Sequence, residues 1–271
     1  MDVSFWGVRG SFPCPGPDHI RYGGNTSCVM VLCDNHPVIF DSGTGMRPLG
    51  DWLLSEKYQH ADLLLSHVHL DHIFGFPFFA PVYQDNFCLD VRCGNLLPEY
   101  TIREVLAVQM SPPTFPITLN QLKANINFID FEAGQGFMIG DNISVKTQAL
   151  PHPDKATAYR LTFRGRSICY VTDTEHKRND INLDLVKFID GADLLIYDST
   201  YSDENFPIHI GWGHSTWQEG IRLAQASDSK QLAIFHHDPR STDSILDNIQ
   251  TLASQHWAGA FVAREGQTLT L

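Results

Sequence analysis

The sequence predicts an α/β protein in which two β-sheets pack face to face and helices cover both outer faces, an αββα sandwich. Two observations lead to this fold class. Short runs rich in β-branched and aromatic residues, bounded by Gly and Pro turns, recur in both halves of the chain and indicate strands. Helix signals follow several of these strands, so that two mainly β halves carry helices outside. The 271 residues contain no linker, repeat or low-complexity run, and we expect one domain spanning residues 1–271.

The first half supplies one predicted sheet. Strands are expected over residues 3–6, 28–33 and 38–41. A helix is predicted over 46–57, and the apolar run at 61–66 predicts a buried strand.

The second half supplies the other sheet and most of the helices. Four strand-like runs cover residues 125–131, 143–149, 157–163 and 167–172. Helices and strands then alternate: a helix at 181–189, a strand at 194–198, a helix at 216–226, a strand at 231–235, a helix at 242–255 and a strand at 260–263.

Residues 84–124 fit this scheme less well. A helix is predicted within 98–110, but the three prolines at 111–116 exclude regular structure there, because proline fixes φ and lacks an N–H donor. Two interpretations stay open. The segment is a stiff surface connection, or it is an inserted lid or wall over a cleft, with Phe115 pointing inward.

Composition restricts the partners of the protein. A net charge of −12 and a pI near 5.4 argue against a broad basic face for extended nucleic acid, although bound cations would still allow an anionic substrate. No apolar run reaches membrane-spanning length, and the N-terminus lacks the features of a signal peptide, so we expect a cytoplasmic protein without membrane contact. The six cysteines are scattered and are expected to be reduced.

Four potential metal ligands occur within six residues: His67, His69, Asp71 and His72. Imidazole and carboxylate groups suit zinc and similar first-row ions. The cluster lies between two apolar runs, and one short loop could present ligands to two metals. The alternative is a histidine-rich surface loop.

This pattern, His-x-His-x-Asp-His after a strand, resembles the signature of the metallo-β-lactamase superfamily. The other landmarks follow in the expected order: Asp41-Ser42-Gly43-Thr44-Gly45, His152, Asp173, His214 and His236-His237. Two further segments resemble the phosphodiesterase branch, which includes ribonuclease Z and cyclic phosphodiesterases. They are Arg21-Tyr22-Gly23-Gly24-Asn25-Thr26-Ser27 and Gly213-His214-Ser215-Thr216. The resemblance implies the same αββα fold.

The resemblance also implies two divalent metal ions, with zinc expected and manganese or iron as alternatives. It assigns His67, His69 and His152 to the first ion, Asp71, His72 and His236 to the second, and Asp173 to both as a bridge.

Several assignments have a plainer alternative. His152 stands in a proline-flanked loop and could be an ordinary loop histidine, and Asp173 could cap a helix or form a turn. His236 is preferred over its neighbour as the last ligand because the family shows a histidine directly after the strand. His237 would then support a ligand or face the substrate.

Three more residues are candidates for the chemistry. The branch motif implies that His214 contacts the phosphate and protonates the leaving oxygen, and the alternative is a structural histidine in a Gly-rich turn. Asp41 is expected to hold a ligand imidazole in one tautomer, or else to form a turn. Asn25 is expected to bind a substrate oxygen, or to shape its own turn.

We therefore expect a binuclear hydrolase of phosphodiesters, with water activated between the metals, Asp71 orienting it and His214 as general acid. A small or cyclic nucleotide-type substrate is favoured, since the surface is acidic and the RNA-gripping arm of ribonuclease Z is not recognisable. The alternatives are an RNA 3′-processing endonuclease, a hydrolase of lactones, thioesters or β-lactams, and a non-catalytic carrier protein of the same fold. The family also suggests a homodimer.

Overall fold

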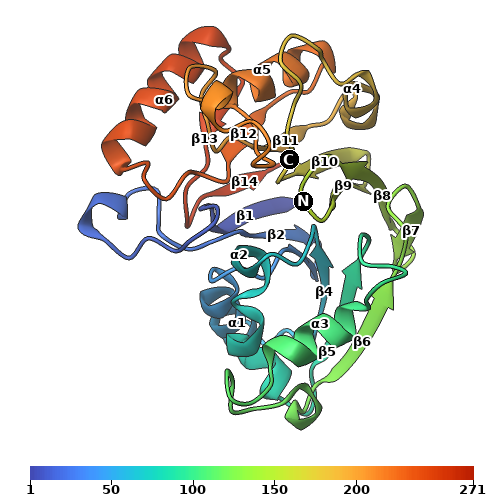
Figure 1. Cartoon of the computed structure of the whole chain (residues 1–271). Coiled ribbons are helices and arrows are strands. Elements are labelled where there is room, and N and C mark those ends of the chain that lie inside the picture. Colours follow the sequence, from blue (N-terminus) through green and yellow to red (C-terminus); the bar gives the residue numbers. More distant parts are fainter.

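Two seven-stranded sheets face each other in the computed structural model, which describes all 271 residues (Figure 1). The first sheet contains, in spatial order, β14 (Thr268–Thr270), β1 (Asp2–Gly7), β2 (Cys28–Cys33), β3 (His36–Phe40), β4 (His60–Leu65), β5 (Cys88–Cys93) and β6 (Asn125–Asp130). The second contains β13 (Ala260–Val262), β12 (Leu232–Phe235), β11 (Leu194–Asp198), β10 (Arg166–Val171), β9 (Ala156–Phe163), β8 (Ile143–Leu150) and β7 (Gly136–Ile139).

Helices cover the two outer faces (Figure 1). On the side of the first sheet lie α1 (Met46–Ser55), the short α2 (Leu70–Ile73) and α3 (Ile102–Gln109), and on the side of the second lie α4 (Leu183–Ile189), α5 (Trp217–Ala226) and α6 (Asp243–His256). A third apolar cluster fills the space between the sheets. The predicted αββα sandwich is therefore confirmed. None of the helices combines the length and the hydrophobicity that crossing a bilayer requires.

The alternation of side chains along β4 explains why this strand reads as a continuous apolar run. Leu64 points into the core between the sheets, whereas Leu63 and Leu65 pack under the helices of the outer face. A strand that is covered on both faces buries both sets of side chains. The strand is thereby fixed rigidly at the point where the histidine cluster begins.

Both sheets bring strand ends to a shared edge. In the first sheet β3, β4, β5 and β6 run parallel, and in the second β10, β11, β12 and β13 run parallel. The carboxyl ends of parallel strands lie at one edge of a sheet, which is where the side chains of open α/β sites converge. Asp41 follows β3, His67 follows β4, and His236 follows β12.

Part of residues 84–124 belongs to the first sheet, since β5 is an internal strand between β4 and β6, and no strand was predicted there. Leu89, Val91 and Cys93 alternate with Asp90 and Arg92, a strand signal that the prediction did not use. Asp90 and Arg92 lie on the face toward the second sheet and pair with each other at 3.0 Å. The predicted helix is present as α3. Phe115 packs edge-on against Phe78, with ring centroids 5.6 Å apart.

Some smaller elements were not part of the prediction. The short strands β7 and β14 were not predicted. Helix α5 is capped by Thr216, whose hydroxyl accepts the N–H of Glu219. The neighbouring Ser215 hydroxyl lies 2.8 Å from both His176 Nδ1 and the Tyr197 hydroxyl.

Candidate metal centre

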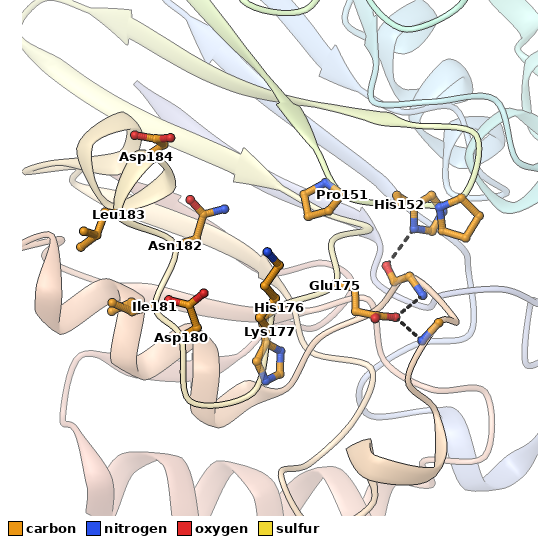
Figure 2. A pocket seen from close by; sticks show the side chains of 13 residues that line it. Pro151, His152, Glu175, His176, Lys177, Asp180, Ile181, Asn182, Leu183 and Asp184 are labelled. Atoms are coloured by element: carbon orange, nitrogen blue, oxygen red, sulfur yellow. Dashed lines mark hydrogen bonds between the residues drawn. The ribbon is translucent and has the colours of Figure 1, made fainter.

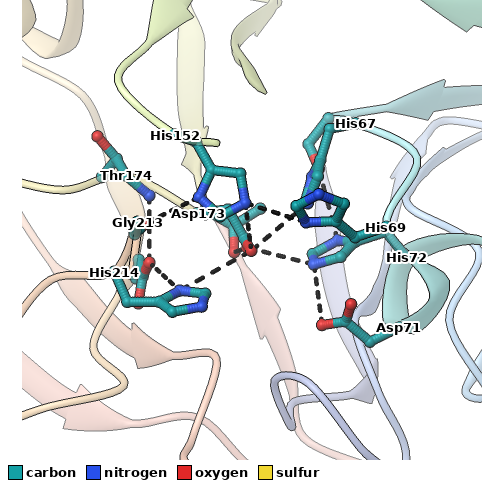
Figure 3. A network of polar contacts seen from close by, with 12 residues as sticks. His67, His69, Asp71, His72, His152, Asp173, Thr174, Gly213 and His214 are labelled. Atoms are coloured by element: carbon teal, nitrogen blue, oxygen red, sulfur yellow. Dashed lines mark hydrogen bonds and ion pairs between the residues drawn. The ribbon is translucent and has the colours of Figure 1, made fainter. Parts of the chain in front are cut away.

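The histidine cluster is presented by the turn between β4 and α2 (Figure 3). His69 is the N-cap of α2, so His67 precedes the helix while Asp71 and His72 belong to its only turn. His67 and His72 are buried, whereas His69 is partly exposed. Because the backbone changes from extended to helical within this segment, His67 and His69 point to one ligand group and Asp71 and His72 to another, as the sequence indicated.

The first ligand group consists of His67, His69 and His152. His152 Nε2 lies 3.1 Å from His69 Nδ1. His67 Nε2 is buried and has no hydrogen-bond partner. A buried polar nitrogen without a partner costs free energy, and a metal ion would satisfy it.

The second group consists of Asp71, His72, Asp173 and His236, all of them buried or nearly so. His236 Nε2 lies 3.3 Å from His72 Nε2 and 3.3 Å from Asp71 Oδ2. His72 Nε2 is also 3.2 Å from Asp71 Oδ2. The three side chains thus direct nitrogen and oxygen atoms at one point.

Asp173 connects the two groups through its two oxygens. Oδ2 is 3.6 Å from the Nε2 atoms of His67 and His152, whereas Oδ1 is 3.2 Å from His72 Nε2 and 3.1 Å from His236 Nε2. Ligand atoms that surround a tetrahedral ion at Zn–N distances near 2.1 Å are separated by about 3.4 Å. The donor set and its spacing therefore fit two divalent ions that share one carboxylate.

The charges in the centre favour cations. Burial, and then the neighbouring His72, hold the pKa of His67 well below its usual range, so this imidazole is neutral. Burial opposes ionisation of Asp173, but the imidazoles of His236 and His72 keep its pKa well below the usual value. Burial likewise lowers the pKa of His72, yet the carboxylates of Asp173, Asp71 and Asp41 raise it well above normal. A cation in the second group would displace that proton, so metal binding there is expected to release protons.

Two of the ligand rings are also held at Nδ1, the ring nitrogen on the other side from Nε2. His72 Nδ1 is 2.7 Å from Asp41 Oδ2, which also accepts the hydroxyl hydrogens of Ser66 and Tyr170 at 2.8 Å each. His152 Nδ1 is 2.8 Å from the carbonyl oxygen of Gly213. Such contacts fix the tautomer and leave Nε2 for a metal. Asp41 therefore lies where the prediction placed it, against a ligand imidazole.

Three residues of the centre have left-handed backbone. Asp41, Asp173 and His236 have φ values of 58°, 55° and 60°. Residues with a Cβ adopt this region at a steric cost, and such residues concentrate at functional sites. The positive φ occurs directly after β3 and β12 and just beyond β10, where the chain turns away from the sheet.

His214 stands beside the two groups and is held by a carboxylate of its own. Its Nδ1 lies 3.0 Å from Asp198 Oδ2 and 3.8 Å from Asp173 Oδ2. Burial lowers the pKa of His214, but Asp198 raises it to about 9. The sequence reasoning missed Asp198. Its signal is an acid at the end of the apolar strand β11, close to where Asp41 and Asp173 follow β3 and β10.

Two predicted contacts with substrate are not supported by the structure. Asn25 Nδ2 donates to Glu265 Oε2 at 3.1 Å, and its Oδ1 accepts the hydroxyl of Thr44 at 3.0 Å, so this amide is occupied in shaping its own loop. His237 is buried, with Nε2 2.8 Å from the carbonyl oxygen of Ala263. The left-handed backbone at His236 turns the chain after β12, so the ring of His237 lies against Ala263 and outside the ligand group.

Phe115 is likewise placed against Phe78 and is not part of either ligand group. Glu175, to which no role was assigned, accepts the backbone N–H groups of Gly211 and Gly213 at 2.7 and 2.9 Å. Because the carbonyl oxygen of Gly213 in turn accepts from His152 Nδ1, Glu175 helps to fix the loop that carries His214 against His152.

Two cavities flank the centre. One, of about 590 Å³, lies on the side of His152 and is lined mostly by polar residues that include Glu175, Lys177 and Asn182 (Figure 2). The other, of about 510 Å³, lies on the side of His69. Its wall includes the apolar and aromatic side chains Val68, Leu96, Tyr100, Val105 and Val108. Ligand pockets commonly have volumes of about 300–1,000 Å³.

The fold and this centre define a member of the β-lactamase superfamily. Residues 36–237 match the family model described as the Beta-lactamase superfamily domain, and the chain belongs to that family. The predicted superfamily is thereby confirmed.

More particular similarities point to one set of relatives. The chain is 25% identical to a ribonuclease Z of Picrophilus torridus, over 97% of this chain and 93% of the relative. It is 29% identical to a ribonuclease Z of Haloferax volcanii, over 99% and 94% of the two chains. The solved structure of the metallo-β-lactamase fold protein YhfI from Bacillus subtilis superimposes with a TM-score of 0.75 at 20% identity, covering 99% of this chain and 98% of the other. The predicted enzyme class, a metal-dependent hydrolase, agrees with these names.

Proposed function

We propose that this protein is a binuclear metal-dependent phosphodiesterase. The observation that carries the proposal is the position of Asp173, whose two oxygens each face a separate set of imidazoles. His67, His69 and His152 would hold the first ion, and Asp71, His72 and His236 the second. Zinc is expected from the nitrogen-rich donor set, and manganese or iron would also be accepted. Ions bound there would lower the pKa of bound water and offset negative charge on the phosphate.

The protein side chains would orient and move protons around that pair. With Nδ1 directed at Asp198, Nε2 of His214 is the nitrogen that remains to donate a proton to the leaving oxygen. A pKa raised to about 9 keeps His214 protonated at neutral pH, as a general acid requires. Asp71 would orient the attacking water in addition to binding the second ion. Its Oδ2 faces His72 and His236 and is held in place by the N–H of Ser11 at 2.7 Å.

The substrate is proposed to be a small diester of the cyclic-nucleotide or compact-nucleotide type. The polar cavity beside His152 and the partly apolar cavity beside His69 would receive two unlike substituents of one phosphate. A net charge of −12 disfavours a long nucleic-acid footprint.

RNA 3′-processing is the second candidate. It is favoured by the names of the curated relatives, which match nearly the full length of the chain. Hydrolysis of a lactone, thioester or β-lactam is weaker, because it leaves the protonated His214–Asp198 pair without a role. A carrier protein of the same fold would not require that pair either.

A homodimer is the proposed assembly, and sedimentation equilibrium would test it.

The test is a metal analysis combined with a hydrolysis panel. The panel comprises bis-p-nitrophenyl phosphate, 2′,3′- and 3′,5′-cyclic nucleotides, precursor transfer RNA, a lactone and a β-lactam. We expect metal-dependent cleavage of the diesters with the highest kcat/KM on a small one. Cleavage of precursor transfer RNA alone would select the second candidate, and turnover of the lactone or β-lactam alone would reject the phosphodiesterase.

A further inference from the structure

A second group of potential metal-binding side chains lies at the amino-terminal ends of β3 and β4, away from the candidate metal centre. His36 is the first residue of β3, and His60 is the first residue of β4. Asp62 is two residues further along β4, so its side chain lies on the same face of the sheet as that of His60. β3 and β4 are parallel neighbours, with Val38 paired to Asp62. The pairing brings the three side chains together.

The ligand atoms of these three residues converge. His36 Nε2 lies 2.7 Å and His60 Nε2 3.9 Å from the same oxygen, Asp62 Oδ2. The ring centroids of His36 and His60 are 4.8 Å apart. In the first ligand group of the candidate metal centre, the corresponding ring spacings are 4.5, 4.8 and 5.0 Å. The imidazoles are therefore spaced as closely as those of the main centre.

Arg92 on β5 orients the carboxylate. Its guanidinium pairs with Oδ1 of Asp62, and also with Asp90 at 3.0 Å. This arrangement directs Oδ2, the other oxygen of Asp62, at the two histidines. Carboxylates that bind metals through one oxygen are commonly held by a hydrogen bond to the other.

We propose that His36, His60 and Asp62 form a further divalent metal site, separate from the candidate metal centre, that takes zinc or a similar first-row ion. Two nitrogens and one oxygen leave at least one position for water, and this donor set suits zinc, copper and nickel better than calcium or magnesium.

The local charges support a cation at this place. Asp62 and Asp90 carry two negative charges and Arg92 one positive charge, so the cluster has one uncompensated negative charge while the histidines are neutral. Burial, and then the charge of Arg92, lower the pKa of His36, and burial together with His36 lowers the pKa of His60. Asp62 itself is buried, with 2% of its side chain exposed. Neutral imidazoles beside a buried carboxylate offer lone pairs to a metal.

The site would join two strands far from the chemistry. β4 has six residues, and at a rise of about 3.3 Å per residue its first and last residues are roughly 17 Å apart. An ion at the His36 end would thus tie β3 to β4 without touching the ligands that follow Leu65. We expect it to stabilise the fold and to leave catalysis unchanged, since anything that binds only the folded state raises its stability.

The test compares bound zinc in the wild type, the His60→Ala variant and the His36→Ala/His60→Ala variant, after equilibration with zinc and removal of the excess. His60 is 42% exposed, so its single replacement leaves the core intact. His256→Ala, which removes an exposed imidazole from the end of α6, is the matched control. We expect one zinc equivalent fewer per chain in the double variant, loss of a zinc-induced rise in melting temperature, and unchanged hydrolysis of bis-p-nitrophenyl phosphate.

Equal zinc content in the wild type and the double variant would overturn the proposal. An equal loss in the His256→Ala control would do the same, because it would show that any surface histidine accounts for the difference. The comparison uses the change in zinc content and not its absolute value, and it therefore holds whether or not the candidate metal centre proves binuclear.

Discussion

Asp198 holds His214 at Nδ1, the ring nitrogen that also lies 3.8 Å from Asp173 Oδ2. One oxygen of Asp198 lies 3.0 Å from His214 Nδ1 and accepts the N–H of Thr174, while the other accepts the N–H and the hydroxyl of Thr200. The carboxylate is fully buried and cannot rotate without breaking these contacts. The position and the charge of His214 therefore depend on a residue at the end of β11 that touches no substrate.

Replacing Asp198 by Asn should lower the pH at which activity is lost on the alkaline side. His214 has a pKa raised to about 9 by Asp198, and a general acid stops working as the pH rises through its pKa. Cations in the centre oppose protonation of His214, so the wild-type activity is expected to fall at or below this pH. Removal of the Asp198 charge should move the alkaline fall in activity to a still lower pH. The pH profile of kcat/KM measures the shift, with Asp203→Asn, whose carboxylate pairs with Arg222, as control. If the alkaline side of the kcat/KM profile stays at the same pH in the Asp198→Asn variant, Asp198 does not set the pKa of the general acid.

His214→Ala should keep both metals and lose rate by about 10²- to 10⁴-fold, because general acids contribute factors of that order. The loss should be large for a ribose leaving group and small for p-nitrophenolate, which leaves without protonation. Metal analysis and kcat on both substrates give the answer. A uniform loss on both substrates would point to phosphate positioning in place of proton transfer.

Asp173→Asn should remove at least one of roughly two bound ions per chain, since a bridging carboxylate serves both sites. The amide keeps the shape of the side chain but offers one oxygen and no charge. Elemental analysis measures the content, and Asp51→Asn on the exposed side of α1 is the control. A single ion that persists unchanged in the Asp173→Asn variant would reject the binuclear centre.

His236→Ala should reduce metal content, whereas His237→Ala should reduce thermal stability and retain the metals. His236 Nε2 faces Asp71, His72 and Asp173, but the His237 ring is buried against the carbonyl oxygen of Ala263. Elemental analysis and melting curves separate the two effects. The reverse result would show that the assignment is displaced by one residue.

Asp41→Asn should weaken zinc binding by about 10- to 100-fold, the usual effect of removing a group that orients a ligand histidine. Tyr170→Phe removes only one of the hydrogen bonds to the same carboxylate and should weaken binding less. Competition with a coloured chelator measures both affinities. Equal affinities in the Asp41→Asn variant and the wild type would reject this orienting role.

The fold and the ligand groups were predictable because they depend on local pattern and order. The apolar run before His67 marks a strand covered on both faces, and the spacing of His67, His69 and His72 within one turn identifies the cluster. β5 was not predicted although Leu89 and Val91 alternate with Asp90 and Arg92, because this polar face lies inside the sandwich, where the charged pair satisfies itself.

The residues that were missed or misplaced depend on contacts across the chain. Asp198 and His214 are near each other only because β11 and the loop before α5 meet at one edge. Asn25 resembled a substrate contact until its partner Glu265 was placed beside it. A single sequence shows the type of a side chain but not the distant residue with which that side chain forms its hydrogen bonds.

The left-handed backbone at Asp41, Asp173 and His236 implies a trade-off between durability and activity. Glycine would relax each of these turns but would remove the side chain that the centre needs, so the strain persists at all three positions. Bound ions would offset this cost by stabilising the folded chain, so the strained turns make the durability of the protein depend on its metals. Removal of the ions is therefore expected to lower the melting temperature as well as the activity.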